Sequence, residues 1–272
     1  MNMTTSKTRS LLIDEPNLST AWARAFLAII DGPGKRIAPL AVTVRGFESG
    51  QPLEDGSIRM ALDGALRTIG EQEVHTVANT IFPSSVWRFS GGDRARFYQT
   101  YLKNVPRYVA LAKSKNGRGL YFERLIAFGA GPCDGNQLEH MILSYTERKG
   151  VRASMFQAAV FDPGRDHVKS AQLGFPCLHA ISFVPSDGGL IVNAFYATQQ
   201  IFEKAYGNYL GLCRLGAFMA AQMGLEMQQL SCFIGVEKLD TTPKSAKPLQ
   251  PLIEACRSHV TAEDLSQGGM TA

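Results

Sequence analysis

The chain has 272 residues, of which 45% are hydrophobic and 19% are charged, the balance of an ordinary globular protein with a substantial core. Its net charge of +4 is not concentrated in any lysine- and arginine-rich run, so a nucleic-acid polymer is not an expected partner. No stretch of about 18 apolar residues is present for a membrane helix. Even the most apolar long segment, residues 210–225, contains Arg214 and Gln222.

The five cysteines are widely spaced and include no CxxC pair, which argues against a disulfide framework and is typical of a reducing compartment. Cys177 and His179 have no second pair of ligands at zinc-site spacing, so no metal site is expected. The apolar run Leu11-Leu12-Ile13 is too short for the core of a signal peptide. We therefore expect a cytoplasmic protein.

Helical and strand-like patterns are mixed along the chain. Trp22, Phe26 and Ile29 recur at helical spacing and predict a helix over residues 18–30. Further helices are expected at residues 56–68, 71–81, 93–112 and 136–148, from Asn208 onward, and at residues 252–257. Strands are expected at residues 37–47, 154–161, 180–184 and 190–196.

This mixture favours a single α+β domain over residues 18–257. The polar, irregular segments at residues 1–17 and 258–272 are expected to be flexible tails.

Cys177 is the first candidate for chemistry, because it follows a proline and begins an apolar run. A cysteine acts as a nucleophile through its thiolate, which needs a nearby cation or helix N-terminus to lower the pKa of the thiol. In a regular strand His179 lies on the same face as Cys177, two residues away. Two interpretations stay open for Cys177: a catalytic nucleophile, polarised by His179, and a buried structural cysteine.

Three further groups of polar residues are candidates for binding. Lys35 and Arg36 follow a Gly-Pro-Gly segment and suit a phosphate, although they are equally a helix stop followed by solvated charges. Asn208 is either a helix cap or an amide that reads the edge of a nucleobase. Lys238 and Asp240 lie on one face of a strand end, as a surface pair or as partners of sugar hydroxyls.

The spacing of these residues resembles the carboxyl-terminal half of thymidylate synthases and the related pyrimidine hydroxymethylases. That family has a Pro-Cys-His segment, an Asp-Gly-x-Leu turn and, further on, an asparagine that reads the base. Counted without gaps from Cys177, these features correspond to Gly188, Leu190 and Asn208. The segment Gly235-x-x-Lys238-Leu239-Asp240 corresponds to the family's later Gly-Asp-x-His-x-Tyr segment.

The resemblance covers residues 18–240. It implies a thymidylate-synthase-like α+β fold, in which a mixed sheet is packed by helices around a long central helix, and a homodimer formed through the backs of two sheets. It also implies that the Cys177 thiolate adds to carbon 6 of a pyrimidine. Carbon 5 then reacts with methylenetetrahydrofolate, while Asn208 selects the base.

Several positions depart from the family pattern. Lys238 and Asp240 replace the His and Tyr that hold the sugar. The family's phosphate-binding Arg-Ser pair corresponds to Ala197 and Thr198, so the cation is lost and only the hydroxyl of Thr198 remains. The family's Asp corresponds to Gln200. Arg152 is the nearest substitute for the paired arginines that reach in from the partner subunit.

Other family features are weaker or missing. The segment Gly119-Leu120-Tyr121-Phe122 resembles a Gly-x-x-Tyr segment, which makes its tyrosine a substrate-binding candidate, and His179 lies one step from the family's His. The catalytic Glu has no counterpart in residues 71–82, and the tail that closes over folate is not recognisable. Losing several charge-assisted hydrogen bonds of about 1.5–3 kcal/mol each weakens phosphate binding by orders of magnitude unless other cations compensate.

Two functions are therefore expected. The first is a divergent enzyme that transfers a methyl or hydroxymethyl group to carbon 5 of a pyrimidine nucleotide or nucleoside through a covalent Cys177 adduct. The alternative is a catalytically inactive homologue that binds nucleotides or acts as a scaffold. The absent Glu and arginines favour the alternative, whereas the spacing from Cys177 to Asn208 favours the enzyme.

Overall fold

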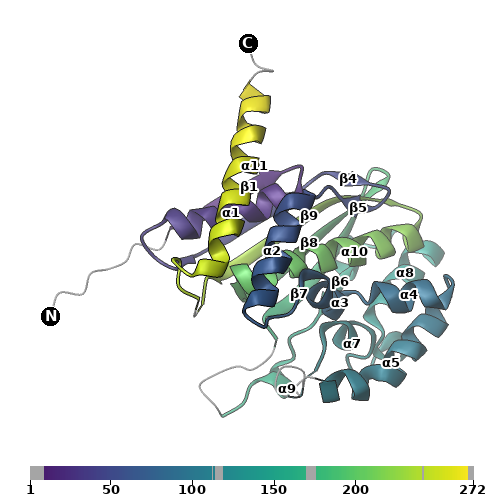
Figure 1. The fold of residues 1–272 in the computed structure, drawn as a ribbon. Helices are drawn as coiled ribbons and strands as arrows, with labels where there is room; N and C mark the ends of the chain where they lie inside the picture. The colour runs from purple at the N-terminus through teal and green to yellow at the C-terminus, as the bar shows by residue number, and fades with distance from the viewer. Residues whose placement is uncertain (1–8, 112, 114–118, 170–175, 241, 269–272) are drawn as a thin grey trace.

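The computed structural model describes residues 9–268 except 112, 114–118, 170–175 and 241. It contains a mixed sheet of seven strands in the order β1-β3-β9-β8-β7-β6, with β2 also paired to β9, and helices pack around this sheet (Figure 1). The predicted α+β class, with a mixed sheet packed by helices, is confirmed.

The elements follow one another irregularly along the chain. The strands of the large sheet are β1 (Leu11–Glu15), β2 (Arg36–Ile37), β3 (Leu40–Val44), β6 (Gln157–Ala159), β7 (Leu178–Ser186), β8 (Gly189–Gln200) and β9 (Glu226–Lys238). A separate hairpin consists of β4 (Phe47–Glu48) and β5 (Gln51–Pro52). The helices are α1 (Leu18–Asp31), α2 (Gly56–Thr68), α3 (Val74–Ile81), α4 (Ser84–Ser90), α5 (Arg94–Leu111), α7 (Tyr121–Ile126), α8 (Gln137–Glu147), α9 (Pro163–Asp166), α10 (Tyr206–Met223) and α11 (Gln250–Gly268).

Two pairs of parallel strands organise the sheet. β1 runs parallel to β3, and β8 runs parallel to β9, while the pairs β3–β9, β7–β8 and β6–β7 are antiparallel. Because parallel neighbours need a crossover, α1 lies between β1 and β3 in the chain and α10 lies between β8 and β9. α10 is therefore placed directly against the sheet.

Small residues allow α10 to pack closely on two sides. A Cβ atom added at Gly207 would lie 2.5 Å from the Val77 Cβ of α3, and one added at Gly216 would lie 2.6 Å from the Met227 sulfur of β9. Neither position accepts a larger side chain without movement of its neighbours. This close packing fixes α10 between α3 and the sheet.

The sheet is kinked along a line that crosses β7, β8, β9 and the junction of β2 and β3. In a regular strand the buried side chains recur at every second residue. Here the interval is three residues, at Leu178 and Ile181, Tyr196 and Gln199, Ile234 and Glu237, and Ile37 and Leu40. The positions match across the sheet, because Leu178 pairs with Tyr196 and Tyr196 pairs with Ile234.

Both predicted tails are wrong for the residues that the structure describes. Residues 11–15 form β1, because β3 offers a parallel edge and Ile13 is buried against the core. Residues 258–268 belong to α11, which continues well past Arg257. His259 of α11 contacts Thr20 of α1 at 2.9 Å and so helps to dock the helix.

The other boundaries differ less. The helix over residues 56–68 is confirmed at both ends, since Asp55 caps its first turn. The strand expected at residues 154–161 is shorter in the structure, where β6 covers only Gln157–Ala159, because residues 153–155 form a 3-10 turn. None of the helices in the described part of the chain has the length and apolarity to cross a membrane.

The buried ion pair between Arg124 and Asp166 provides a test of the packing. The guanidinium of Arg124 binds both carboxylate oxygens of Asp166, at 2.7 and 2.9 Å, and both side chains are nearly inaccessible to solvent. Asp166→Ala leaves the cation buried without its carboxylate, so the free energy of unfolding in urea should fall by about 3–5 kcal/mol. Asp264→Ala, which removes an exposed partner of Arg24, should cost less than about 1 kcal/mol. Equal effects of the two variants would contradict this assignment.

The same pair has a defined pH dependence. Burial raises the pKa of Asp166, but the hydrogen bonds and the charge of Arg124 outweigh it and leave the pKa below its ordinary value. The stabilisation is therefore present at neutral pH and is lost as the pH falls below about 4. Urea titrations should show a weaker acid dependence for Asp166→Ala than for the wild-type chain.

Candidate active site

Cys177 lies directly before β7, at the end of the sheet where β8 and β9 finish. Its carbonyl oxygen accepts the Ala197 N–H at 3.0 Å, which holds its backbone against β8. Cys177 is exposed as a residue, but the protein packed around its sulfur excludes water and raises the pKa of the thiol above its ordinary value, and the positive charge of Lys238 opposes this with a smaller effect. The thiol is therefore protonated at neutral pH, and Lys238 is the cation that favours its ionisation.

Three of the predicted binding residues meet at this end of the sheet. Gln200 of β8 pairs in register with Lys238 of β9, and the Gln200 amide donates a hydrogen bond to the Asp240 carboxylate. The Lys238 ammonium lies 3.3 Å from the same carboxylate. The hydrogen bond from Gln200, followed by the contact and charge of Lys238, lowers the pKa of Asp240, which is ionised at neutral pH. Asp240 also has a left-handed backbone, with φ of 53°, which is costly and typical of a constrained site.

Lys35 and Arg36 join the same end of the sheet, although they lie about 200 residues earlier in the chain. Arg36 pairs in register with Lys238, and the Leu239 N–H donates to the Lys35 carbonyl at 2.9 Å. The Lys35 ammonium donates to the Thr242 carbonyl at 3.2 Å, whereas the Arg36 residue is exposed. The charges of Lys238 and Lys35 both act on the Asp240 carboxylate, and Arg36 lies beside Lys238 in the sheet, so this end of the sheet attracts anions.

Tyr121 connects α7 to Cys177. Its phenol oxygen accepts hydrogen bonds from the backbone N–H groups of Cys177 and Leu178, and burial raises the pKa of Tyr121 well above its ordinary value. The phenol is therefore neutral and positions the backbone of the cysteine. Thr198 lies two residues before Gln200 on β8 and, like it, is partly exposed.

Asn208 lies in the first turn of α10 and is only 5% exposed. Its amide makes no hydrogen bond to any residue that the structure describes. The neighbouring side chains are engaged elsewhere, since Tyr206 contacts Ser19 at 2.7 Å and Tyr209 lies against Glu237. The Asn208 amide, with one donor group and one acceptor group, is therefore available to solvent or to a ligand.

The structure does not bring His179 or Arg152 to Cys177. A bulge between Leu178 and Ala180 interrupts the alternation of β7, so His179 is not placed beside the thiol. Its ring stacks on Phe161, with centroids 4.7 Å apart, and burial lowers its pKa. Arg152 is exposed before the turn that precedes β6.

A buried polar cluster close to this site was not predicted from the sequence. Glu237 and Gln199 are cross-strand neighbours that the kink turns into the core, together with Tyr196 and Tyr209. Burial raises the pKa of Glu237 well above its ordinary value, so its carboxyl group is protonated. Strict alternation along β9 places Glu237 on the opposite face, and the local sequence Val236-Glu237-Lys238 gives no signal that this acid is buried.

No group of three or more His, Cys, Asp or Glu side chains in the described ranges has the arrangement of a metal site. No protein-family model matches the chain, and no curated protein matches it. The functional interpretation therefore depends on the geometry above and on the motif spacing.

The influence of Lys238 on the thiol is testable by alkylation. Lys238→Met removes the charge that lowers the pKa of Cys177, so the midpoint of the pH profile for iodoacetamide modification of Cys177, followed by mass spectrometry of the peptide, should move upward. Lys247→Met, in an exposed turn, is the matched control and should leave the midpoint unchanged. An unchanged midpoint for Lys238→Met would show that the ammonium does not act on the thiol.

Proposed function

We propose that this chain is a divergent thymidylate-synthase-like enzyme, which transfers a methyl or hydroxymethyl group to carbon 5 of a pyrimidine nucleotide or nucleoside through a covalent Cys177 adduct. The observation that carries the proposal is the convergence of Cys177 with Gln200, Lys238, Asp240 and Arg36 at one end of the sheet. These residues come from separate segments, and the motif spacing selects all of them except Arg36, which follows the Gly-Pro-Gly segment.

The order of elements around this site supports a thymidylate-synthase-like fold. The cysteine precedes a hairpin of β7 and β8, which leads into α10 with Asn208 in its first turn, and β9 then returns with Lys238 at its end. In Figure 1, α10 lies along the sheet between β8 and the surrounding helices. The proposal takes Cys177 as the nucleophile, Asn208 as the base-reading amide and Lys238 with Asp240 as the sugar-binding pair, and these residues lie at or next to strand and helix ends.

The proposed chemistry begins at the thiol. Cys177 loses its proton to solvent, and its sulfur bonds to carbon 6 while the electron pair of the C5=C6 bond moves towards the carbonyl oxygen on carbon 4. Carbon 5 thereby becomes a nucleophile. Lys238 favours the thiolate, and the amide of Asn208 has both a donor and an acceptor for the base edge. Carbon 5 bonds to the electrophilic carbon of a one-carbon donor, and loss of the original carbon 5 proton with elimination of the Cys177 sulfur then restores the C5=C6 bond. On the transferred carbon, the bond to the donor is replaced by water in a hydroxymethyl product and by hydride in a methyl product.

The cations at this end of the sheet take the place of the lost phosphate-binding arginine. Lys35 and Arg36 lie beside Lys238, and Thr198 retains a hydroxyl on the neighbouring strand. With fewer arginines than the family has, this arrangement suits a nucleoside or a weakly held phosphate.

Methylenetetrahydrofolate is the one-carbon donor that the resemblance implies. The described residues do not fit a folate site of the family's kind: α11 packs on α1 and α2, where His259 contacts Thr20, and no glutamate takes the family's catalytic position in α3. We therefore derive no step through folate.

The open face of the sheet supports the proposed homodimer. A row of apolar residues crosses six strands in register, namely Leu12, Ala41, Phe233, Phe195, Ala180 and Ala159. Three of its large side chains are 76%, 47% and 40% exposed, in the order Leu12, Phe233 and Phe195. A contiguous apolar row on a sheet surface marks an interaction site. Arg152 precedes the edge strand β6, from where the resemblance implies that it reaches the partner's site.

A specific observation favours the inactive alternative. The pKa of the Cys177 thiol is raised, and the His179 ring is held in an aromatic stack instead of beside the sulfur. A chain that binds nucleotides without turnover retains the cations and Asn208 but needs no thiolate.

Trapping of the nucleophile distinguishes the two functions. Incubation with a panel of 5-fluoropyrimidine nucleotides and nucleosides, with methylenetetrahydrofolate, should give a covalent mass increase in the intact protein. The increase should vanish in Cys177→Ala and persist in Cys133→Ala, which removes the other exposed cysteine. Binding without any adduct would support the inactive homologue, and an adduct that survives Cys177→Ala would contradict the assigned nucleophile.

The dimer is tested at Phe233. Phe233→Arg places a charge in the middle of the apolar row, so light scattering after size exclusion should show a dimer for the wild-type chain and a monomer for the variant. Phe89→Arg, at an exposed phenylalanine on α4, is the control and should remain dimeric. A wild-type monomer would contradict the proposed assembly.

A further inference from the structure

A cavity of about 1070 Å³ lies at the opposite end of α10 from Cys177. Its walls come from α3, α4, the second half of α10 and the hairpin of β4 and β5. Phe218 of this cavity is ten residues beyond Asn208, which corresponds to roughly 15 Å along a helix. The cavity is therefore separate from the candidate active site.

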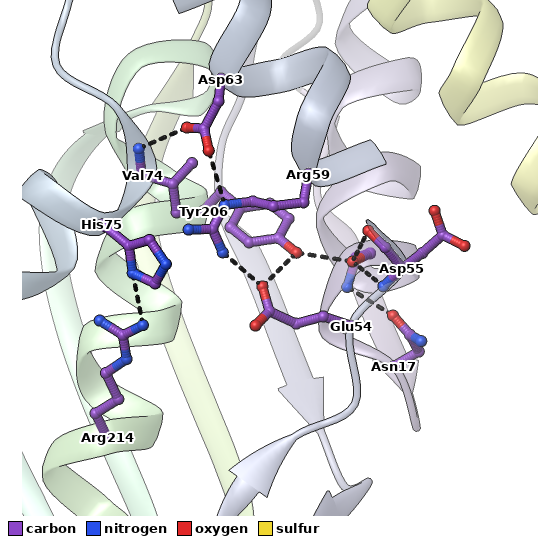
Figure 2. Close-up of polar contacts among 10 residues, drawn as sticks. Asn17, Glu54, Asp55, Arg59, Asp63, Val74, His75, Tyr206 and Arg214 are labelled. Atoms are coloured by element: carbon purple, nitrogen blue, oxygen red, sulfur yellow. Dashed lines mark hydrogen bonds and ion pairs between the residues drawn. The ribbon is translucent and has the colours of Figure 1, made fainter. Parts of the chain in front are cut away.

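The charges around the cavity are predominantly positive. Arg88 and Arg214 line it, and Glu226 is the only acidic residue among those lining it. Arg214 contacts His75 at 2.7 Å and has no carboxylate partner among the interactions of the described residues (Figure 2). Burial and then the charge of Arg59 lower the pKa of Arg214, an effect that a bound anion reverses.

The nearest acidic groups make their hydrogen bonds to other residues, although the charge of Glu54 still acts on Arg214. Glu54 accepts hydrogen bonds from Arg59 at 2.9 Å and from the Tyr206 hydroxyl at 2.8 Å, and Asp63 accepts from Arg59 and from the Val74 N–H (Figure 2). Arg59 is thus held by two carboxylates, whereas Arg214 points towards His75.

Arg214 also fixes the state of His75. An arginine side chain only donates hydrogen bonds, so the Nδ1 atom of His75 must be the acceptor. The proton of the neutral imidazole then resides on Nε2, which is a donor. Burial, followed by the charges of Arg59 and Arg214, lowers the pKa of His75 and keeps the ring neutral.

Two amide side chains in the wall have oxygens that already accept hydrogen bonds from other residues, as the Nδ1 of His75 does. The Gln222 side-chain oxygen accepts from Arg94 at 3.0 Å, and the Asn79 side-chain oxygen accepts from the Ser84 hydroxyl at 3.4 Å. Their NH₂ groups remain as donors. Together with the two arginines and the Nε2 of His75, these NH₂ groups give the wall several donors that match the oxygens of an anion.

Aromatic rings supply the remaining wall. Trp87 packs edge-on against Phe218, with centroids 4.9 Å apart, and both line the cavity with Phe82. A site with a few convergent polar groups and an aromatic wall is typical of a small-molecule site.

We propose that this cavity binds a small molecule that carries a carboxylate or phosphate group on a flat apolar body. The oxyanion contacts Arg214, Arg88 and the Nε2 donor of His75, and the apolar body lies against Trp87 and Phe218.

Calorimetry with defined probes tests this site. Phenyl phosphate and benzoate represent the two oxyanions, and benzyl alcohol is the neutral analogue. At least one anion should bind saturably while benzyl alcohol does not, and the anion that binds better identifies the class of ligand. Arg214→Met and Arg88→Met should each weaken that binding at least about ten-fold, the loss expected for one charge-assisted hydrogen bond.

Controls separate this site from the proposed active site. Arg96→Met removes an exposed arginine that stacks on Phe89 outside the cavity, and it should bind the probes as the wild-type chain does. Cys177→Ala should also bind them normally. The proposal is overturned if neither anion binds, or if binding is unchanged in Arg88→Met, whose exposed side chain can be replaced without disturbing the core. Neither result affects the proposed chemistry at Cys177.

Discussion

The kink across β7, β8, β9 and the junction of β2 and β3 is the constraint on which the candidate site depends. Because the interval between buried residues changes from two to three, Gln199 and Glu237 turn into the core while Gln200 and Lys238 stay accessible. A straight sheet would reverse these assignments. The three-residue interval occurs at matching positions in neighbouring strands. A single strand therefore cannot return to the two-residue interval without losing register with its neighbours.

The close packing of α10 is a second constraint on the position of the candidate site. The glycines that bring α10 against α3 and the sheet also fix the position of its two ends. One end carries Asn208 next to the strand ends of the candidate active site, and the other end carries Arg214 and Gln222 into the cavity. The two sites therefore share one rigid helix while using different residues and different chemistry.

Local patterns predicted the elements better than the site. The helix over residues 56–68 was predictable because Asp55 caps it and its apolar residues recur at helical spacing. Of the residues that the motif spacing selects, Lys238 contacts Asp240 and its charge acts on the Cys177 thiol, while their roles stay predictions. His179 was placed wrongly beside Cys177, because a bulge in β7 depends on the neighbouring strand and leaves no local signal.

Contacts between distant segments account for the other errors. The sequence predicts tails where the structure has β1 and the second half of α11. Both elements are stabilised by residues far away in the chain, so they leave no local signal. The cavity is built from several segments that are distant in the chain, and the donors that its wall presents depend on which amide oxygens are already bonded. Such pairing cannot be predicted from residue type or spacing alone.

The most direct test of the central claim is hydrogen exchange at carbon 5. In the proposed mechanism, reversible addition of Cys177 to carbon 6 lets carbon 5 take a proton from solvent and then lose its original hydrogen, without any one-carbon donor. Pyrimidine nucleotides and nucleosides deuterated at carbon 5 are incubated with the protein and weighed by mass spectrometry. At least one of these compounds should lose deuterium with the wild-type chain and with Cys133→Ala, and none should lose it with Cys177→Ala. Complete retention of deuterium by every compound, or equal loss with Cys177→Ala, would contradict the proposed mechanism.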